Sequence, residues 1–139
     1  MKKQLILLGC AAGLMLVPTK AAGKEDTALG KQMDAMNDAY KAFKKATDPV
    51  KGAALAREAQ AAALKSVVEI PDTLKNLPDG SEKAKALVVY HKMIGKLYVT
   101  LCEVEEAFIN GKMDEVTKLV DSLKEIKKSG HEKFVKEEE

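Results

Sequence analysis

Few side chains in this sequence could hold a metal ion or carry a redox reaction. The chain has two histidines, His91 and His131, together with two cysteines and six methionines. Neither histidine has Glu three residues before it, as the E-x-x-H pairs of a di-iron site require. The chain also has no G-x-S-x-G, P-loop, H-E-x-x-H or C-x-x-C-H motif, which excludes the corresponding enzyme classes and covalent haem attachment. We therefore predict that the protein is not an enzyme.

Met33 and His131 are the pair of residues that we expect to act together. The first and last helices of an antiparallel four-helix bundle are neighbours, so the start of one lies level with the end of the other. Met33 falls about seven residues after the expected start of the first helix, and His131 falls about seven before an expected end near Glu138. On a helical wheel, Met33 shares a face with Met36, and His131 shares one with Val120. A histidine and a methionine opposed across a bundle are the usual axial ligands of a low-spin electron-transfer haem.

The apolar residues recur with the period of an α-helix in four segments. The first is expected to begin near Asp26 or Thr27 and to end by Thr47. The other expected bounds are Pro49 to about Ile70, Ser81 to the turn Asn110–Gly111, and about Asp114 to near Glu138. Two short connections and one longer connection join helices of about twenty residues. This pattern predicts an all-α fold, an antiparallel up-down-up-down four-helix bundle.

Each segment has a face that we expect to point inward. In chain order, the expected inner residues are Leu29, Met33, Met36, Tyr40 and Phe43; Val50, Ala54, Ala61, Leu64 and Val68; Leu87, Tyr90, Ile94, Leu97, Leu101, Val104 and Phe108; and Val116, Val120, Leu123 and Ile126. His91 lies at the boundary of the third face, and Cys102 lies beside it, where we expect a buried and inert thiol.

Residues 1–23 have the composition of a secretory signal peptide. Two lysines follow Met1, an apolar run spans Leu5–Val17, and Ala21-Ala22-Gly23 supplies small residues for cleavage. The apolar run is too short to span a bilayer comfortably. The alternative is a lipoprotein signal with Cys10 as the lipid-bearing residue, which we disfavour because it leaves little apolar sequence before the cysteine.

Cleavage after residue 23 would leave residues 24–139 as the mature domain. The removed segment carries three lysines, so the formal net charge would fall from +2 to −1. A near-neutral domain of mixed charges gives no reason to expect nucleic acid as a partner. Cys102 would be the one remaining cysteine, so no intramolecular disulfide could form.

Several stretches of the chain carry a resemblance to a known family. They are M-D-A-M-N-D-A-Y-K at Met33, A-A-A-L at Ala61, Pro71 after the second helix, N-G-K-M-D-E-V at Asn110, and L-K-E-I-K-K-S-G-H-E-K-F at Leu123. Through them, residues 29–134 resemble the cytochrome b562 family of periplasmic four-helix haem proteins.

The resemblance implies one non-covalently held haem b, whose axial ligands map onto Met33 and His131. It implies further haem contacts from Tyr90, Ile94, Pro71 and Lys127.

Two positions depart from the family pattern. Lys127 stands where the family usually has Arg, and a lysine lacks the forked guanidinium that pairs with a haem propionate. Gly130 stands where the family has Tyr before the histidine. Gly130 either makes room for the macrocycle beside His131 or marks a pocket that has lost its cofactor, and the sequence leaves both readings open.

The resulting expectation is a small periplasmic b-type cytochrome that carries electrons between unidentified, transient redox partners. No stable membrane insertion is expected after removal of the signal. The alternative is a haem-free periplasmic bundle of the same fold, acting as a binding or stress-related module or holding Cu(I). Met33, Met36 and His131 would supply the soft ligands that suit Cu(I).

Overall fold

The computed structural model describes residues 27–135. The predicted signal peptide at residues 1–23 and the alternative lipidation site at Cys10 lie outside the described residues, so both stay predictions. The described residues form helices and no strands, which confirms the all-α prediction. The helices are α1 (Ala28–Phe43), α2 (Pro49–Ser66), α3 (Asp72–Lys75), α4 (Ser81–Ile109) and α5 (Met113–Phe134).

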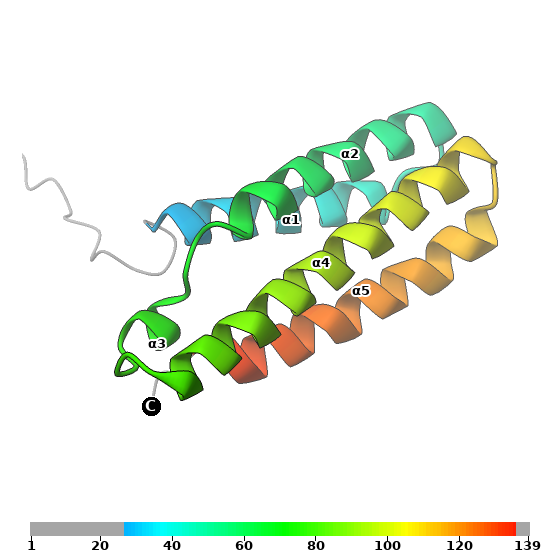
Figure 1. Cartoon of the computed structure of the whole chain (residues 1–139). Helices are drawn as coiled ribbons and strands as arrows, with labels where there is room; N and C mark the ends of the chain where they lie inside the picture. The colour runs from blue at the N-terminus through cyan, green and yellow to red at the C-terminus, as the bar shows by residue number, and fades with distance from the viewer. Residues whose placement is uncertain (1–26, 136–139) are drawn as a thin grey trace, which may run out of the picture.

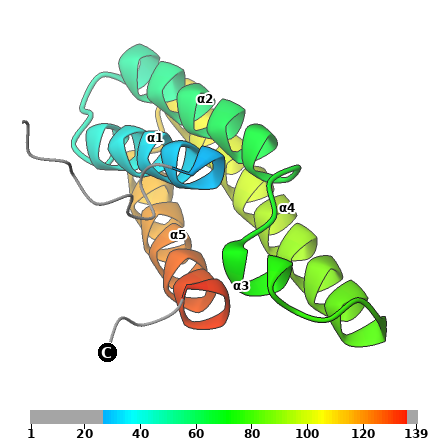
Figure 2. The same ribbon diagram turned by 90° about the vertical axis from the view of Figure 1, so that its left-hand side faces the viewer.

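Four of these helices are long, and they pack in a defined order (Figure 1). Close backbone contacts join α1 to α2, α2 to α4 and α4 to α5, and the short α3 packs on α4. The helices α1 and α5, by contrast, share few close backbone contacts. Figure 2 shows the same helices turned by 90°. No helix among residues 27–135 is both long and apolar enough to cross a membrane.

Side chains that cap the helix start mark the beginnings of α1 and α2. Thr27 caps α1, since its hydroxyl oxygen accepts a hydrogen bond of 2.9 Å from the Gly30 amide. Asp48 caps α2 in the same way with a 2.8 Å bond from the Lys51 amide, and Pro49 is the first helical residue. Gly111 adopts a φ of 65° in the turn before α5, a conformation that glycine adopts readily.

Two helix ends differ from the prediction. The second helix ends at Ser66 rather than near Ile70, and a proline after Ile70 disfavours the helical backbone there. The last helix ends at Phe134 rather than near Glu138, because Val135 is already extended. The connection after α2 also contains α3, which is too short to leave a periodic signal in the sequence.

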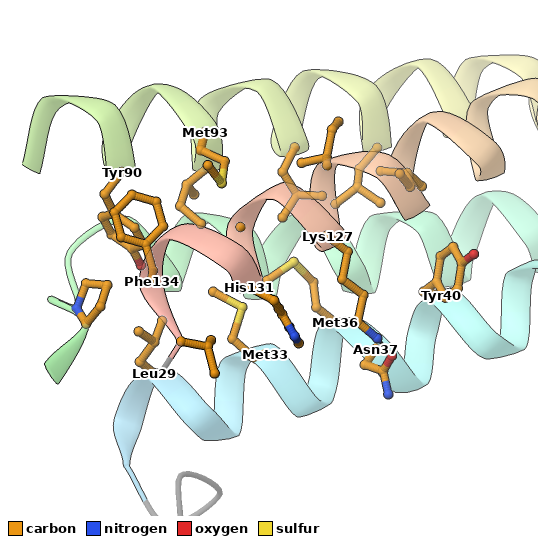
Figure 3. A pocket seen from close by; sticks show the side chains of 18 residues that line it. Leu29, Met33, Met36, Asn37, Tyr40, Tyr90, Met93, Lys127, His131 and Phe134 are labelled. Carbon is orange, nitrogen blue, oxygen red and sulfur yellow. Dashed lines mark hydrogen bonds between the residues drawn. The ribbon is translucent and has the colours of Figure 1, made fainter. Parts of the chain in front are cut away.

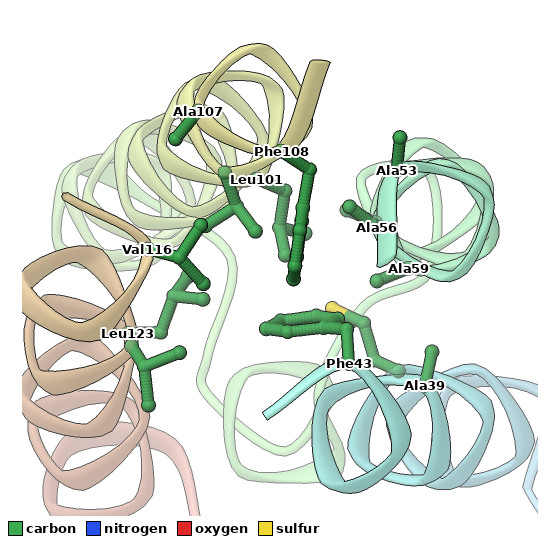
Figure 4. Packing of buried hydrophobic residues seen from close by; sticks show 14 of the residues in the cluster. Ala39, Phe43, Ala53, Ala56, Ala59, Leu101, Ala107, Phe108, Val116 and Leu123 are labelled. Carbon is green, nitrogen blue, oxygen red and sulfur yellow. The ribbon is translucent and has the colours of Figure 1, made fainter. Parts of the chain in front are cut away.

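The core contains the predicted faces of three helices. Residues of α1, α4 and α5 that were expected to be inner are buried or half-buried. Phe43 and Phe108 are fully buried at the centre, with ring centroids 6.5 Å apart and planes at 76° (Figure 4). This edge-to-face arrangement is the one that aromatic pairs prefer.

The predicted inner face of α2 is wrong. Val50 and Val68 are 81% and 76% exposed, and Leu64 is 55% exposed. Ala54 and Ala61 are exposed as well, so the whole predicted stripe points to solvent.

The face of α2 that does pack inward carries only small side chains near the aromatic centre. It presents Gly52, Ala53, Ala56 and Ala59 to the other helices. A methyl group on Gly52 would collide with the ring of Phe108. The ring of Phe108 leaves no room for a larger side chain at Gly52. Because α2 is one continuous helix, the orientation set there leaves Val50 and Leu64 exposed.

Candidate functional site

An apolar cavity lies between α1, α4 and α5, on the side where α1 and α5 make few contacts. It has a volume of about 180 Å³, and a second cavity of about 410 Å³ adjoins it toward α3. The second volume alone falls in the range of roughly 300–1,000 Å³ that is typical of small-molecule sites. Figure 3 shows the first cavity with the side chains that line it.

All six predicted site residues line this region. Met33, His131, Pro71 and Lys127 border both cavities. Tyr90 and Ile94 form part of the α4 wall of the first. The structure thus brings together residues that are up to about a hundred positions apart in the sequence.

Met33 and His131 approach the cavity from opposite helices. Met33 lies in the second turn of α1 and is half-buried, whereas His131 lies in the last turn of α5 and is exposed at the cavity mouth. Both side chains are directed into the space between the two helices (Figure 3). Met33 and His131 lie at the same height along the bundle, as predicted (Figure 3). The earlier end of α5 at Phe134 does not change this, because Phe134 comes after His131.

Aromatic residues build a rigid wall at the end of the cavity. Tyr90 is 2% exposed, and its hydroxyl donates a 2.7 Å hydrogen bond to the Ser66 carbonyl at the end of α2. The ring of Phe134 packs edge-to-face on Tyr90 with centroids 5.4 Å apart. Burial, with a smaller contribution from the charge of Glu69, raises the pKa of Tyr90 to about 12, so the phenol stays protonated at neutral pH.

A polar contact crosses from α5 to α1 at the cavity mouth. The Lys127 ammonium donates a 2.8 Å hydrogen bond to the Asn37 side-chain oxygen. Both residues border both cavities, and Lys127 is exposed. The Lys127 ammonium is therefore a positive charge at the cavity mouth, where it could pair with an anionic group of a bound molecule.

Met93 is a site residue that the sequence reasoning missed. It lies on α4 between Tyr90 and Ile94, and its side chain lines the first cavity. Met93 is adjacent to the predicted inner position Ile94 rather than on the seven-residue repeat, so periodicity did not select it. Asn37 and Phe134 were also missed as cavity residues, because the contacts that place them there are made with other helices. Asn37 of α1 accepts a hydrogen bond from Lys127 of α5, and Phe134 of α5 packs on Tyr90 of α4.

Gly130 now has a structural explanation. A Cβ atom built at Gly130 would lie 3.1 Å from the sulfur of Met93, closer than ordinary van der Waals contact. The missing side chain therefore lets Met93 reach the backbone of α5 directly beside His131.

The remaining histidine and cysteine lie outside the site. His91 is exposed on α4 and does not line either cavity. Cys102 is partly exposed rather than fully buried, which corrects the prediction of a buried thiol. Among residues 27–135, no cluster of three or more His, Cys, Asp or Glu side chains could hold a metal ion.

The fold and the site together define a class of protein. It is a helical protein with an apolar cavity between its first and last long helices, into which one thioether and one imidazole project from opposite sides. Residues 28–135 match the family described as Cytochrome b562, and the chain belongs to that family. The protein is thus a b-type cytochrome-like helical protein from a family of electron carriers that are generally not enzymes. Comparison with curated proteins finds no match.

Proposed function

We propose that this protein is a small electron-carrying cytochrome that binds one non-covalent haem b, with Met33 and His131 as its axial ligands. The observation that carries the proposal is the placement of these two side chains. They enter the same apolar cavity from α1 and α5, and both border its extension.

The residues present fit this group. A flat, largely apolar macrocycle matches a wall built from aromatic, aliphatic and thioether side chains. Tyr90, Ile94 and Phe134 would pack against it, and Pro71 would flank its edge. Lys127 would turn from Asn37 toward a propionate at the mouth.

When bound, haem supplies a one-electron couple between Fe(II) and Fe(III). Met33 would hold the potential high, because a thioether ligand favours the reduced state. The buried wall would exclude water from one side of the site, while exposure at the mouth would let electrons pass during brief encounters. We accordingly propose transient redox partners of unidentified type.

We further propose that the bound state is an antiparallel up-down-up-down four-helix bundle. Close backbone contacts join α1 to α2, α2 to α4 and α4 to α5, whereas they are few between α1 and α5. A haem held by one residue from each of these two helices would join them and complete the bundle.

We also propose a periplasmic location, on the basis of the signal-like composition of residues 1–23. We also propose that the protein does not stay inserted in a membrane after the signal peptide is removed. We expect no nucleic-acid partner, because positive and negative side chains are nearly equal in number.

Haemin titration of the full chain tests the proposal. Stoichiometric binding should give a sharp Soret band in the absorption spectrum and split visible bands after reduction. Met33→Ala and His131→Ala should each alter the reduced spectrum, because each removes an axial ligand.

Two matched controls use the same residue types away from the cavity. His91→Ala changes an exposed histidine of α4, and Met113→Ala changes a half-buried methionine at the start of α5. Both should retain the wild-type spectrum. A wild-type spectrum equal to that of free haemin, or His131→Ala and His91→Ala spectra that are alike, would refute the proposal.

A further inference from the structure

The cavity contains more sulfur donors than a single axial ligand requires. Met33 and Met36 lie on α1, and Met93 reaches the cavity from α4. Three of the six methionines in the chain therefore line one cavity, beside His131. The haem proposal uses only Met33 from this group.

Met33 and Met36 line the same cavity from one helix. Residues three apart on a helix are surface neighbours, with Cβ atoms about 5–6 Å apart. Both side chains point toward α5, where His131 projects between the helices (Figure 3). Each methionine has three rotatable side-chain bonds, which lets the sulfur atoms adjust to an ion without moving the backbone.

The chemistry of the lining selects the kind of ion. Thioethers are soft ligands that favour Cu(I), whereas Mg²⁺ and Ca²⁺ require carboxylate or carbonyl oxygens. The first cavity is lined by no Asp or Glu. An ion of single charge also loses less hydration energy than a divalent ion on entering an apolar cavity.

Met93 closes the same site from α4. The sulfur of Met93 packs against Gly130, the residue before His131. A Cβ atom built on Gly130 would lie only 3.1 Å from this sulfur. Because Gly130 has no side chain, the thioether of Met93 has room on this wall. This wall excludes water from the side of the site that faces the core.

We propose that the haem-free protein binds one Cu(I) ion, with the sulfur atoms of Met33 and Met36 and the imidazole of His131 as ligands. This inference does not depend on haem binding. Because the two sites would share Met33 and His131, haem and Cu(I) should exclude each other.

Competition against a chromophoric Cu(I) chelator, under reducing and anaerobic conditions, tests the inference. The haem-free full chain should carry Cys10→Ser and Cys102→Ser, since thiolates also bind Cu(I). We expect one equivalent of Cu(I) to be bound. Met36→Leu, which nearly conserves volume, should lower the affinity by about tenfold or more.

Met113→Leu is the matched control, because Met113 lies on α5 and does not line either cavity. It should keep the wild-type affinity. In spectra of protein labelled at the methionine methyl groups, Cu(I) should shift the signals of Met33 and Met36 but not that of Met113.

Two results would overturn the inference. One is failure of the wild-type cavity to compete with the chelator, and the other is equal affinity of Met36→Leu and Met113→Leu. X-ray absorption of the copper-loaded chain that carries only Cys10→Ser and Cys102→Ser adds a test that changes no cavity residue, because a copper environment without sulfur also contradicts the proposal. Haemin binding is measured separately, so either proposal can fail while the other stands.

Discussion

The contact between α2 and α4 at Gly52 makes a sharp prediction about stability. Gly52 is buried in the first turns of α2, where a Cβ atom would lie within overlap distance of three ring carbons of Phe108. The ring cannot move freely, because Phe108 is fully buried and packs edge-to-face on the ring of Phe43. Gly52→Ala should therefore force α2 and α4 apart locally.

The expected magnitude follows from two opposing effects. Overpacking a well-filled core by a methylene-sized group costs about 1–3 kcal/mol. Replacing a helical glycine by alanine contributes about 0.5–1 kcal/mol in the stabilising direction. The severe overlap with a confined ring places the cost toward the upper end, so we expect Gly52→Ala to lower the free energy of unfolding by about 1–2 kcal/mol.

Gly95→Ala provides a matched control within α4. Gly95 is exposed, and a Cβ atom there would meet no neighbouring atom within 4 Å. This variant should gain the helical contribution alone and be more stable than wild type by about 1 kcal/mol. Urea unfolding followed by circular dichroism measures both free energies. The packing argument fails if the two variants change stability in the same direction, or if Phe108→Leu does not reduce the cost of Gly52→Ala.

Three further changes have expected outcomes. Tyr90→Phe removes the hydrogen bond to the Ser66 carbonyl and should cost about 1–2 kcal/mol in urea unfolding at neutral pH. Burial raises the pKa of Tyr90 from 10.0 to about 12, so the unfolded chain loses the phenol proton first as pH rises. The free energy of unfolding of the wild type should therefore fall between pH 10 and pH 12. An equal fall in Tyr90→Phe would contradict this assignment to Tyr90. Glu105→Gln weakens the 2.6 Å bond from Gln60 between α2 and α4 and should cost about 1 kcal/mol, measured by thermal unfolding. Lys127→Arg should tighten haem binding by at most about 1 kcal/mol in haemin titration, since the guanidinium pairs with a carboxylate through two hydrogen bonds but the site is exposed.

Local chemistry was enough to predict where most helices begin. The caps at Thr27 and Asp48 and the turn at Gly111 depend on contacts within three or four residues, which the sequence contains in full. The inner faces of α1, α4 and α5 were also predictable, because large apolar residues occupy only one side of each helix.

The orientation of α2 could not be predicted in this way. The larger apolar residues predicted for this helix form a stripe, yet Val50 and Leu64 are exposed, and so is Val68 just beyond the end of α2. The side that is buried was decided by the rings of Phe43 and Phe108, which come from other helices and leave room only for glycine and alanine. Periodicity identifies a stripe but does not state whether the space beside it is already filled.

The candidate site also depends partly on the sequence alone and partly on how the helices pack. The sequence by itself determined the types of Met33 and His131, the faces on which they lie, and the family to which the chain belongs. Only the tertiary structure decided that Met93 joins them, because its sulfur reaches α5 through the gap that Gly130 leaves between α4 and α5. That contact depends on the distance between two helices, and this distance is set by packing rather than by either helix alone.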